Sequence, residues 1–368
     1  MSSKMYLEGI PDNILAKWIV LQHFERFQSA TLAEIAESYI GIYSTRPTSW
    51  LAILARNQEI NGKNLIFMET DPDLIRIPGM RRSKFLLPKH LASKVFSATR
   101  LPVANHEWRL REVKLTLADY RRVLPDLTEF TKKSPKKLQD IKKFLEMNGP
   151  QARACTTVAT YEGKMIRTAP SNHWSNRWMY MACPSDFLQG DDSLSNCDEL
   201  KLDIANRYIE NYGPVSTEDL AWWMSISKKK ARSLLERTDA VEIETGVWIS
   251  VNKIEDFENF ISNDSKLPPK KVRFLPAWDP LAMGYAPKSR QRECLGINEI
   301  GGYDSSGNGR PVVLIGSRAV TTWNIKGSGS KRSLSLDYSN VPRKVGAVLK
   351  ESALDLANKI GIKYESLI

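Results

Sequence analysis

Three consecutive hydroxyl side chains followed by an arginine form the segment of the sequence best suited to chemistry. They are Tyr43, Ser44 and Thr45, with Arg46 directly after them. Hydroxyl groups can position a water molecule, and side chains two residues apart face the same way in an extended loop, as Tyr43 and Thr45 would. Thr45 could orient the water, and Arg46 could hold a phosphate. The alternative is that the segment only begins a helix, with Ser44 or Thr45 as its N-cap and Pro47 at its first position.

An aspartate and two tryptophans elsewhere in the chain could serve the same chemistry. Asp279 stands immediately before Pro280 in PAWDPLAMG and is the candidate for an acid or base. An aspartate before a proline also favours a structural Asx-turn. Trp174 and Trp178 could stack on a nucleobase or pack under a β-hairpin, and packing is the commoner role of tryptophan.

The basic residues are concentrated in one stretch of the chain. The formal net charge is +11 at pH 7, from 53 Lys and Arg against 42 Asp and Glu. Residues 76–143 hold 18 of these Lys and Arg with only 6 Asp and Glu, and the remainder holds 35 against 36. Such a local excess is typical of an electrostatic footprint for nucleic acid, although a solvated charged face is the competing interpretation. Besides Arg46 and Trp174, we expect DNA contacts from Arg81, Arg82, Lys84, Lys89, His90, Arg109 and Arg111.

The sequence predicts no metal site and no cofactor. Its four cysteines and four histidines form no C-x-x-C pair and show no spacing typical of metal ligands, so we expect reduced thiols. The N-terminal residues MSSKMYLEGIPDN lack the apolar segment of a signal peptide, and no run of about 18 apolar residues occurs. These observations predict a cytoplasmic protein, which we expect to be a monomer.

Helices followed by a β-hairpin recur along the first half of the chain, which is the order of a winged helix. Thr31 and Glu34 have the spacing of a capping box. The first unit is predicted to contain helices over 12–40 and 50–57 and strands over 64–70 and 83–88. The second is predicted to contain helices over 116–127 and 134–149 and strands over 156–163 and 177–183.

The pattern is clearest in a third unit, with Ser216 or Thr217 as a predicted N-cap. Its expected helices cover 199–213, 214–224 and 227–238, and its strands cover 240–246 and 247–252. A hydrophilic linker follows at 262–272, and short strand-like runs with glycine-rich turns then predict a small β-domain that ends in a helix over 341–360.

The fold predicted is α+β, with three tandem winged-helix units followed by a small β-barrel-like domain. The predicted boundaries are 1–97, 98–195 and 196–262 for the winged helices and 263–368 for the β-domain.

Segments of these units together resemble the AlkZ/YcaQ type of winged-helix DNA glycosylase. The segments are GIYSTRPTSWLAILAR (41–56), GMRRSKFLLPKHLA (79–92), GPVSTEDLAWWMSISKKKARSLL (213–235) and FLPAWDPLAMGY (274–285), the last joined to GNGRPVVLIGSRAVTTWNI (307–325). Their order and spacing carry the resemblance more than any single motif. The resemblance implies a C-shaped protein around duplex DNA that hydrolyses an N-glycosidic bond without metal.

The resemblance also implies a catalytic triplet in the first unit, Gln-aliphatic-Gln or Gln-aliphatic-Asp, after a Gly-aliphatic pair. Gly41 and Ile42 precede the matching place, which holds Tyr43-Ser44-Thr45 with neither glutamine nor carboxylate. Asp279 lies in a stretch that faces the first unit in the family, so it is the candidate for the missing acid.

We expect a DNA glycosylase that acts on a bulky or modified base and leaves an abasic site. Because hydroxyls replace the glutamines, we predict a polar adduct as target, such as the hypermodified cytosine of bacteriophage DNA, with alkylated bases as the other option. The role would then be defence against phage rather than DNA repair. No motif positions a lysine as a Schiff-base nucleophile, so the expected enzyme is monofunctional. The alternatives are a non-catalytic DNA-binding regulator or damage sensor, and an RNA-binding module.

Overall fold

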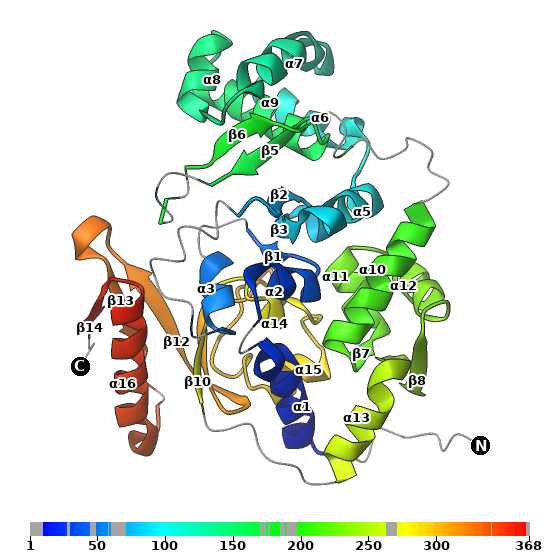
Figure 1. Cartoon of the computed structure of the whole chain (residues 1–368), viewed down its shortest axis with the longest axis vertical. Coiled ribbons are helices and arrows are strands. Elements are labelled where there is room, and N and C mark those ends of the chain that lie inside the picture. The colour runs from blue at the N-terminus through cyan, green and yellow to red at the C-terminus, as the bar shows by residue number, and fades with distance from the viewer. Residues whose placement is uncertain are drawn as a thin grey trace. The chain divides into compact units, whose positions relative to one another are not determined.

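The computed structural model divides the chain into two units (Figure 1). Unit 1 comprises Met1–Ile35, Thr48–Leu65 and Ala205–Ile368, and unit 2 comprises Ala36–Pro47 and Ile66–Ile204. The structure describes residues 10–27, 30–44, 49–57, 59, 71–169, 172, 174–175, 177–184, 188, 197–262, 271–339 and 341–365. The predicted strand over 64–70 lies outside the described residues.

A six-stranded antiparallel sheet organises unit 2. Its order is β1-β3-β2-β5-β6-β4. The strands are β1 (Ile42–Tyr43), β2 (Leu74–Pro78), β3 (Lys84–Pro88), β4 (Lys136–Lys137), β5 (Met165–Thr168) and β6 (Met179–Ala182). The hairpins β2-β3 and β5-β6 are two wings, and they join where Arg76 of β2 pairs with Arg167 of β5. The two wings therefore form one continuous surface.

Helices of unit 2 pack on this sheet around an apolar core. They are η3 (Met80–Arg82), α5 (Lys89–Thr99), η4 (Val103–His106), α6 (Glu107–Arg111), α7 (Leu117–Lys132), α8 (Leu138–Phe144) and α9 (Gly149–Tyr161). Helix α7 begins at a capping box of Thr116 with Asp119, and it continues past Pro125 to Lys132. The core beneath the helices includes Tyr120 and Val158, both fully buried.

The predicted strand over 156–163 is wrong, because α9 runs through most of it. Asn148 and Gln151 form a capping box that starts this helix, and the hydroxyl groups of Thr156 and Thr160 donate to the carbonyl oxygens of Ala152 and Thr156. These hydroxyls are satisfied within the helix, so the β-branched threonines can be buried there against the core. Tertiary packing overrides the strand preference of threonine. The first strand of the second wing is Met165–Thr168.

Most of the third predicted winged-helix segment lies in unit 1, and its elements are confirmed. They are α10 (Cys197–Tyr212), β7 (Val215–Ser216), α11 (Thr217–Met224), α12 (Lys228–Leu235), β8 (Ala240–Glu244) and β9 (Val247–Ser250). Helix α10 begins in unit 2 and ends in unit 1. Ser216 is the N-cap of α11, as predicted, and forms a capping box with Asp219. The same order of helix, short strand, two helices and wing occurs in α7–β4–α8–α9–β5–β6 of unit 2. The count of three winged-helix units stays a prediction.

Unit 1 also contains a five-stranded sheet, and α16 (Arg343–Lys359) packs against it (Figure 1). Its strands run in the order β10 (Val272–Leu275), β11 (Val312–Ile315), β12 (Arg318–Lys326), β13 (Ser333–Leu336) and β14 (Lys363–Glu365). The predicted strands are confirmed, but the pairing of described strands runs in a line from β10 to β14, so the barrel-like closure is not confirmed. The remaining elements are α1 (Asp12–Phe24), η2 (Glu25–Phe27), α3 (Ser49–Leu54), α13 (Val251–Ser262), α14 (Pro280–Met283), α15 (Arg290–Cys294) and η6 (Gly329–Lys331).

Helix α2 (Leu32–Ser38) crosses from unit 1 into unit 2 and leads to β1. Its predicted capping box is confirmed, because the Glu34 carboxylate accepts from the Thr31 amide at 2.7 Å and the Thr31 hydroxyl accepts from the Glu34 amide at 3.3 Å. None of the helices that the structure describes is long and apolar enough to cross a membrane.

Candidate active site and nucleic-acid interface

The short strand β1 ends at Tyr43, the first residue of the predicted catalytic triplet, at the edge of the unit 2 sheet, and Ser44 follows it directly. Gly41 precedes it with a φ of +101°, and a Cβ there would lie 2.8 Å from the Leu87 side chain, so only glycine fits. Tyr43 pairs with Phe85 of β3, and the Ser44 amide donates to the Lys84 carbonyl oxygen at 2.7 Å. The first wing therefore fixes the backbone of Tyr43 and Ser44.

The side chains of Tyr43 and Ser44 lie within the fold. Tyr43 is 5% exposed, and its ring centroid lies 4.4 Å from that of Phe85. Ser44 is fully buried, and its Oγ accepts a hydrogen bond from Nε of Arg76 at 2.7 Å. The Arg76 guanidinium in turn lies over the Trp178 ring, 5.2 Å from its centroid. Thr45 and Arg46 lie outside the described residues, so their roles stay predictions.

The Arg76 contact brings a permanent positive charge next to the Ser44 hydroxyl. Because Ser44 accepts from Arg76, its own proton can be donated to a second group, and the adjacent cation makes the hydroxyl a better donor. A group that becomes negative in a reaction would be stabilised at such a place.

One face of the sheet continues this positive charge across both wings. Paired residues share a face, so Arg76, Arg167 and Tyr180 lie in one row that also takes in Lys136. Lys84 lies on the same face, two residues before Leu86, which is the partner of Arg76 on β3. The cations extend from Ser44 toward the second wing.

The tip of the first wing holds Arg81 and Arg82 in a strained turn. Their φ angles are +51° and +55°, in the left-handed region that non-glycine residues seldom adopt. The Tyr161 hydroxyl of α9 donates to the Arg82 carbonyl oxygen at 2.7 Å and holds the turn in place. The Arg82 side chain is exposed, where it can meet a phosphate, and Arg81 is half-buried.

Lys84 differs from the exposed phosphate contact that its place in the wing suggested. It is only 5% exposed, and its Nζ lies 3.4 Å from the centroid of the Tyr161 ring. Burial, and then the charges of Arg167 and Arg109, hold the pKa of Lys84 well below its usual value.

The other predicted DNA contacts of unit 2 lie on helices and loops near the wings. Lys89 and His90 are exposed at the start of α5, where His90 Nε2 lies 3.1 Å from the Glu37 carboxylate. On α6, Arg111 is exposed and Arg109 is half-buried against Trp108 and Tyr161. Trp174 is half-buried, and Trp178 packs in the core of unit 2, which is the structural alternative for that residue. These positions are compatible with DNA contact, which stays a prediction.

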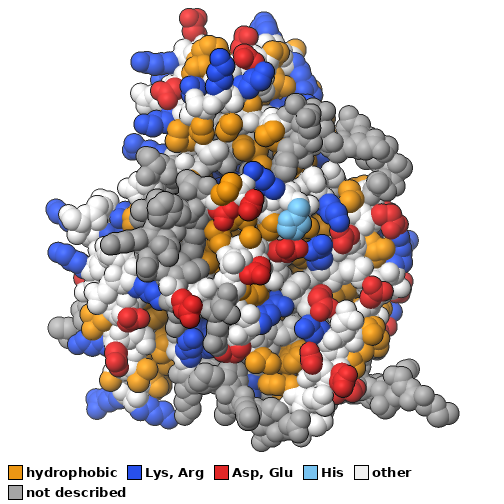
Figure 2. All heavy atoms as spheres, viewed as in Figure 1, with side chains coloured by type: hydrophobic (Ala, Val, Ile, Leu, Met, Phe, Trp, Pro, Cys, Tyr) orange, Lys and Arg blue, Asp and Glu red, His pale blue; other side chains and the backbone are white. Residues whose placement is uncertain are grey.

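A pocket of about 1000 Å³ lies between α8, the start of α9 and β6. Five cations line it, and the described residues around it include no Asp or Glu. The cations are Lys137, Lys142, Arg153, Arg167 and Arg177. Figure 2 shows Lys and Arg side chains in blue along the helices of unit 2 at the top of the view, with fewer acidic side chains among them. Arg153, Arg167 and Arg177 are not among the DNA contacts predicted from the sequence, because they lie outside the basic stretch 76–143. Part of the helix that carries Arg153 was also predicted as a strand.

Comparisons with known proteins place this arrangement in a family. The family model described as DNA glycosylase AlkZ-like matches residues 26–358. The chain belongs to the AlkZ-like DNA glycosylase family. The solved structure of Streptomyces sahachiroi DNA glycosylase AlkZ is similar, with a TM-score of 0.66 at 17% identity, over 96% of this chain and 99% of that chain. No curated protein sequence gives a significant match.

Membership of the AlkZ-like family confirms the resemblance seen in the sequence and makes DNA the partner and base excision the class of activity. The similarity to the Streptomyces structure shows the fold alone. No group of three or more His, Cys, Asp or Glu within the described residues could hold a metal ion.

Asp279, the predicted acid of this AlkZ-like chain, belongs to unit 1 and is fully buried. Its two carboxylate oxygens accept from the Arg56 guanidinium at 2.7 and 2.8 Å, and one also accepts from the Leu281 amide at 2.9 Å, which caps α14. These are the contacts of the structural alternative, the turn before Pro280. An acid role for Asp279 stays a prediction, and it requires the carboxylate to release Arg56.

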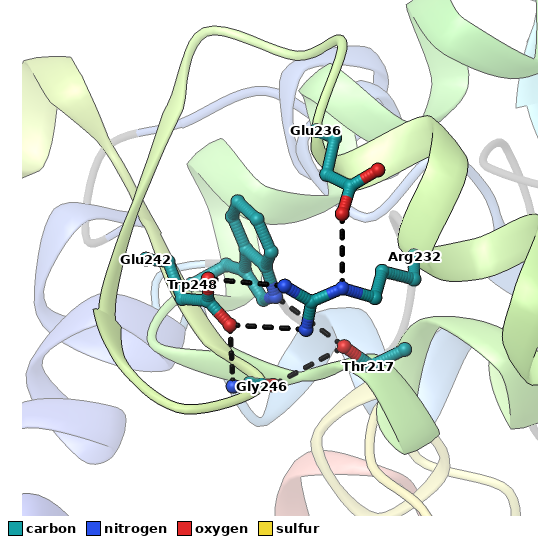
Figure 3. A network of polar contacts seen from close by, with 6 residues as sticks. All are labelled: Thr217, Arg232, Glu236, Glu242, Gly246 and Trp248. Carbon is teal, nitrogen blue, oxygen red and sulfur yellow. Dashed lines mark hydrogen bonds and ion pairs between the residues drawn. The ribbon is translucent and has the colours of Figure 1, made fainter.

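A polar network joins α12 to the wing β8-β9 of the third winged-helix segment and neutralises the charge of Arg232 (Figure 3). Arg232 of α12 donates to both Glu242 oxygens, at 3.1 and 3.2 Å, and to Glu236 at 2.9 Å. Glu242 also accepts from the Gly246 amide at the turn of the wing. Because two carboxylates already surround Arg232, it is a weaker candidate for phosphate contact than the cations of unit 2.

Proposed function

We propose that this chain is a DNA glycosylase that hydrolyses the N-glycosidic bond of a bulky or modified base and leaves an abasic site. The target we propose is a polar adduct, such as a hypermodified cytosine of bacteriophage DNA, with alkylated bases as the second option. The protein would then act as a monomer in defence against phage.

The observation that carries the proposal is the hydrogen bond from Arg76 to Ser44. Hydrolysis adds a water oxygen to C1′ while the C1′–N bond breaks, and the base leaves with the electron pair and takes a proton. A neutral cytosine leaves poorly, so stabilisation of the negative charge on the base lowers the barrier. A Ser44 hydroxyl polarised by Arg76 can donate to that base.

The choice of a polar target rests on the hydroxyl groups of the triplet. Tyr43, Ser44 and Thr45 offer three hydroxyls, each of which can both donate and accept a hydrogen bond. A hydroxymethyl or sugar group on cytosine presents hydroxyls of the same kind. Within this proposal Thr45 orients water, Arg46 holds a flanking phosphate, and Asp279 is the candidate acid.

A second candidate function is DNA binding without chemistry. The burial of Ser44 and Tyr43 and the full pairing of Asp279 with Arg56 favour it, because a reacting group must reach C1′. A base that is flipped out of the duplex must enter an open pocket. Catalysis therefore requires the segment around the triplet to open and let the flipped nucleotide in.

The proposal is tested on three DNAs that differ only in their bases. Purified protein is incubated with unmodified, alkylated and glucosylated phage DNA, and abasic sites are measured as alkali-labile breaks. We expect breaks in the glucosylated DNA and none in the unmodified DNA. Breaks in the alkylated DNA alone would reject a polar adduct as the target. No breaks in any DNA, despite intact binding, would support DNA binding without chemistry.

A further inference from the structure

Lys84 of β3 is the centre of a cluster of basic and aromatic side chains, whose other members come from five further elements of unit 2. Tyr161 of α9 lies against its Nζ, and Arg109 of α6 lies 5.4 Å from the centroid of the same ring. His106 of η4 stacks on that ring, with centroids 4.5 Å apart. Arg167 of β5 and Arg82 of η3 complete the cluster, which we call the Lys84 cluster.

The cluster has no anion of its own within the described residues. The charged groups that act on Lys84, His106 and Tyr161 are Arg82, Lys84, Arg109 and Arg167, all of them basic. Glu162, the next residue after Tyr161, already accepts hydrogen bonds from Tyr120 and Arg121. Arg76, on the same face of the sheet, is bonded to Ser44.

Buried donor atoms in the cluster also lack partners. The Nε atoms of Arg109 and Arg167 are buried and have no hydrogen-bond partner among the described residues. Lys84 is only 5% exposed. Its Nζ lies over the Tyr161 ring and makes no hydrogen bond or ion pair within the described part of the chain. Unpaired buried donors are costly, so a cluster that keeps them is suited to a ligand that accepts several hydrogen bonds.

We propose that the Lys84 cluster binds one phosphate group of the DNA strand, and that Lys84 takes up a proton when the phosphate binds. The inference rests on the proposed function only for DNA as the ligand. Arg82 is exposed and Arg109 and Arg167 are half-buried, so these three meet the phosphate at the surface and Lys84 lies beneath them. The site lies next to Ser44 of the triplet, because the Ser44 amide donates a hydrogen bond to the Lys84 carbonyl oxygen. A phosphate held there belongs to a nucleotide near the base that is excised.

The electrostatics of the free cluster explain the proton uptake. Burial and the charges of Arg167 and Arg109 lower the pKa of Lys84, and burial with Arg109, Lys84 and Arg82 lowers the pKa of His106 to about 4. A phosphate within the cluster supplies the missing negative charge and raises the pKa of Lys84 again. DNA affinity is therefore full at pH values below the lowered pKa of free Lys84, and it falls as the pH rises toward the raised pKa of the bound state.

The test measures binding of an unmodified duplex by the full chain, so that no base is excised. Affinity is recorded from about pH 6 to about pH 10, and proton uptake is obtained by calorimetry in two non-phosphate buffers with different ionisation enthalpies. The variants are Lys84→Met, which removes the amine, and Lys84→Arg, which keeps a permanent charge. Lys350→Met is the control, because Lys350 is an exposed lysine on α16 of unit 1 and is not one of the predicted DNA contacts. Circular dichroism checks that each variant is folded.

We expect wild-type affinity to fall by up to about tenfold per pH unit across the range between the two pKa values of Lys84. Lys84→Arg should bind DNA with little of this pH dependence. Lys84→Met should bind DNA more weakly than wild type, and its proton uptake on binding should be smaller by as much as one proton. Lys350→Met should keep the wild-type affinity and proton uptake. Equal pH dependence and proton uptake in wild type and Lys84→Arg would overturn the proposal.

A second arm separates DNA phosphate from free phosphate. Inorganic phosphate alone is titrated into wild type and Lys84→Arg in the same two buffers. Lys84-dependent proton uptake with DNA supports the assignment to the DNA strand, and such uptake with inorganic phosphate but not with DNA would overturn it. Neither result depends on base excision, so failure here is distinct from failure of the glycosylase proposal.

Discussion

Arg76 donates from its Nε to the Ser44 hydroxyl at 2.7 Å, and this contact ties the predicted catalytic triplet to the first wing. Both residues are buried, with Arg76 at 3% exposed. In the proposed mechanism, this contact lets Ser44 stabilise the leaving base in the absence of the glutamine triplet.

Substitution Ser44→Ala should lower the rate of base excision by at least about tenfold, because Arg76 would have no hydroxyl to polarise. It should also lower the free energy of unfolding by about 1–3 kcal/mol, because the buried Nε donor of Arg76 loses its hydrogen bond to Ser44. Single-turnover excision and denaturant unfolding measure the two effects. Ser44→Thr keeps a hydroxyl and serves as the control. Full activity of Ser44→Ala would remove Ser44 from the mechanism.

Substitution Asp279→Asn should destabilise unit 1, because it removes the charge that compensates the buried Arg56. Breaking a buried ion pair in this way costs about 3–5 kcal/mol, and the cost should shrink when Arg56→Met is made in the same chain. Thermal unfolding of the two single variants and the double variant gives the coupling. An unchanged unfolding temperature with excision lost would instead support Asp279 as the acid, and an active Asp279→Asn protein would exclude that role.

Duplex DNA should bind with a strong dependence on salt, because the cations of unit 2 offer many phosphate contacts. With about six contacts, the slope of log affinity against log salt should approach roughly −5. Charge reversal at Arg82, Arg153 or Arg177 should each reduce the slope by about one, whereas Arg318→Glu in β12 should leave it unchanged. Affinity indifferent to salt between about 50 and 200 mM would show that the basic surface does not bind the DNA backbone.

Chelation should leave DNA binding and excision unchanged. The sequence shows no spacing of metal ligands, and the described residues hold no group of three or more that could bind a metal ion. The measurement compares both activities before and after treatment with EDTA. Activity that is lost on chelation and restored by a divalent ion would contradict a metal-free mechanism.

Local signals in the sequence predicted the parts of the fold that depend on local chemistry. The Thr31–Glu34 capping box and the Ser216 N-cap were confirmed, since each needs only residues within one turn of a helix. The strand predicted over 156–163 was wrong, because Thr156 and Thr160 have strand preference and their burial in α9 depends on partners far away in sequence.

The candidate site was predicted less completely, for the same reason. The place of the triplet after Gly41 stays a prediction. The sequence did not indicate the contact of Arg76 with Ser44, because it arises from the pairing of β1 and β2 with β3. Sequence shows that Lys84 is basic and cannot show that it is buried, because its burial depends on Tyr161 of a distant helix. Long-range pairing therefore decides the chemistry of residues that the sequence can only list.

The identity of the base that the protein releases tests the proposed glycosylase activity most directly. DNA that contains glucosylated hydroxymethylcytosine is incubated with wild type and with Ser44→Ala, and the small molecules in solution are analysed by mass spectrometry. We expect wild type to release the intact modified cytosine base, in amounts equal to the abasic sites formed, and Ser44→Ala to release it at least about tenfold more slowly. Bound DNA with no released base, or release of alkylated purines alone from a matched alkylated DNA, would contradict it.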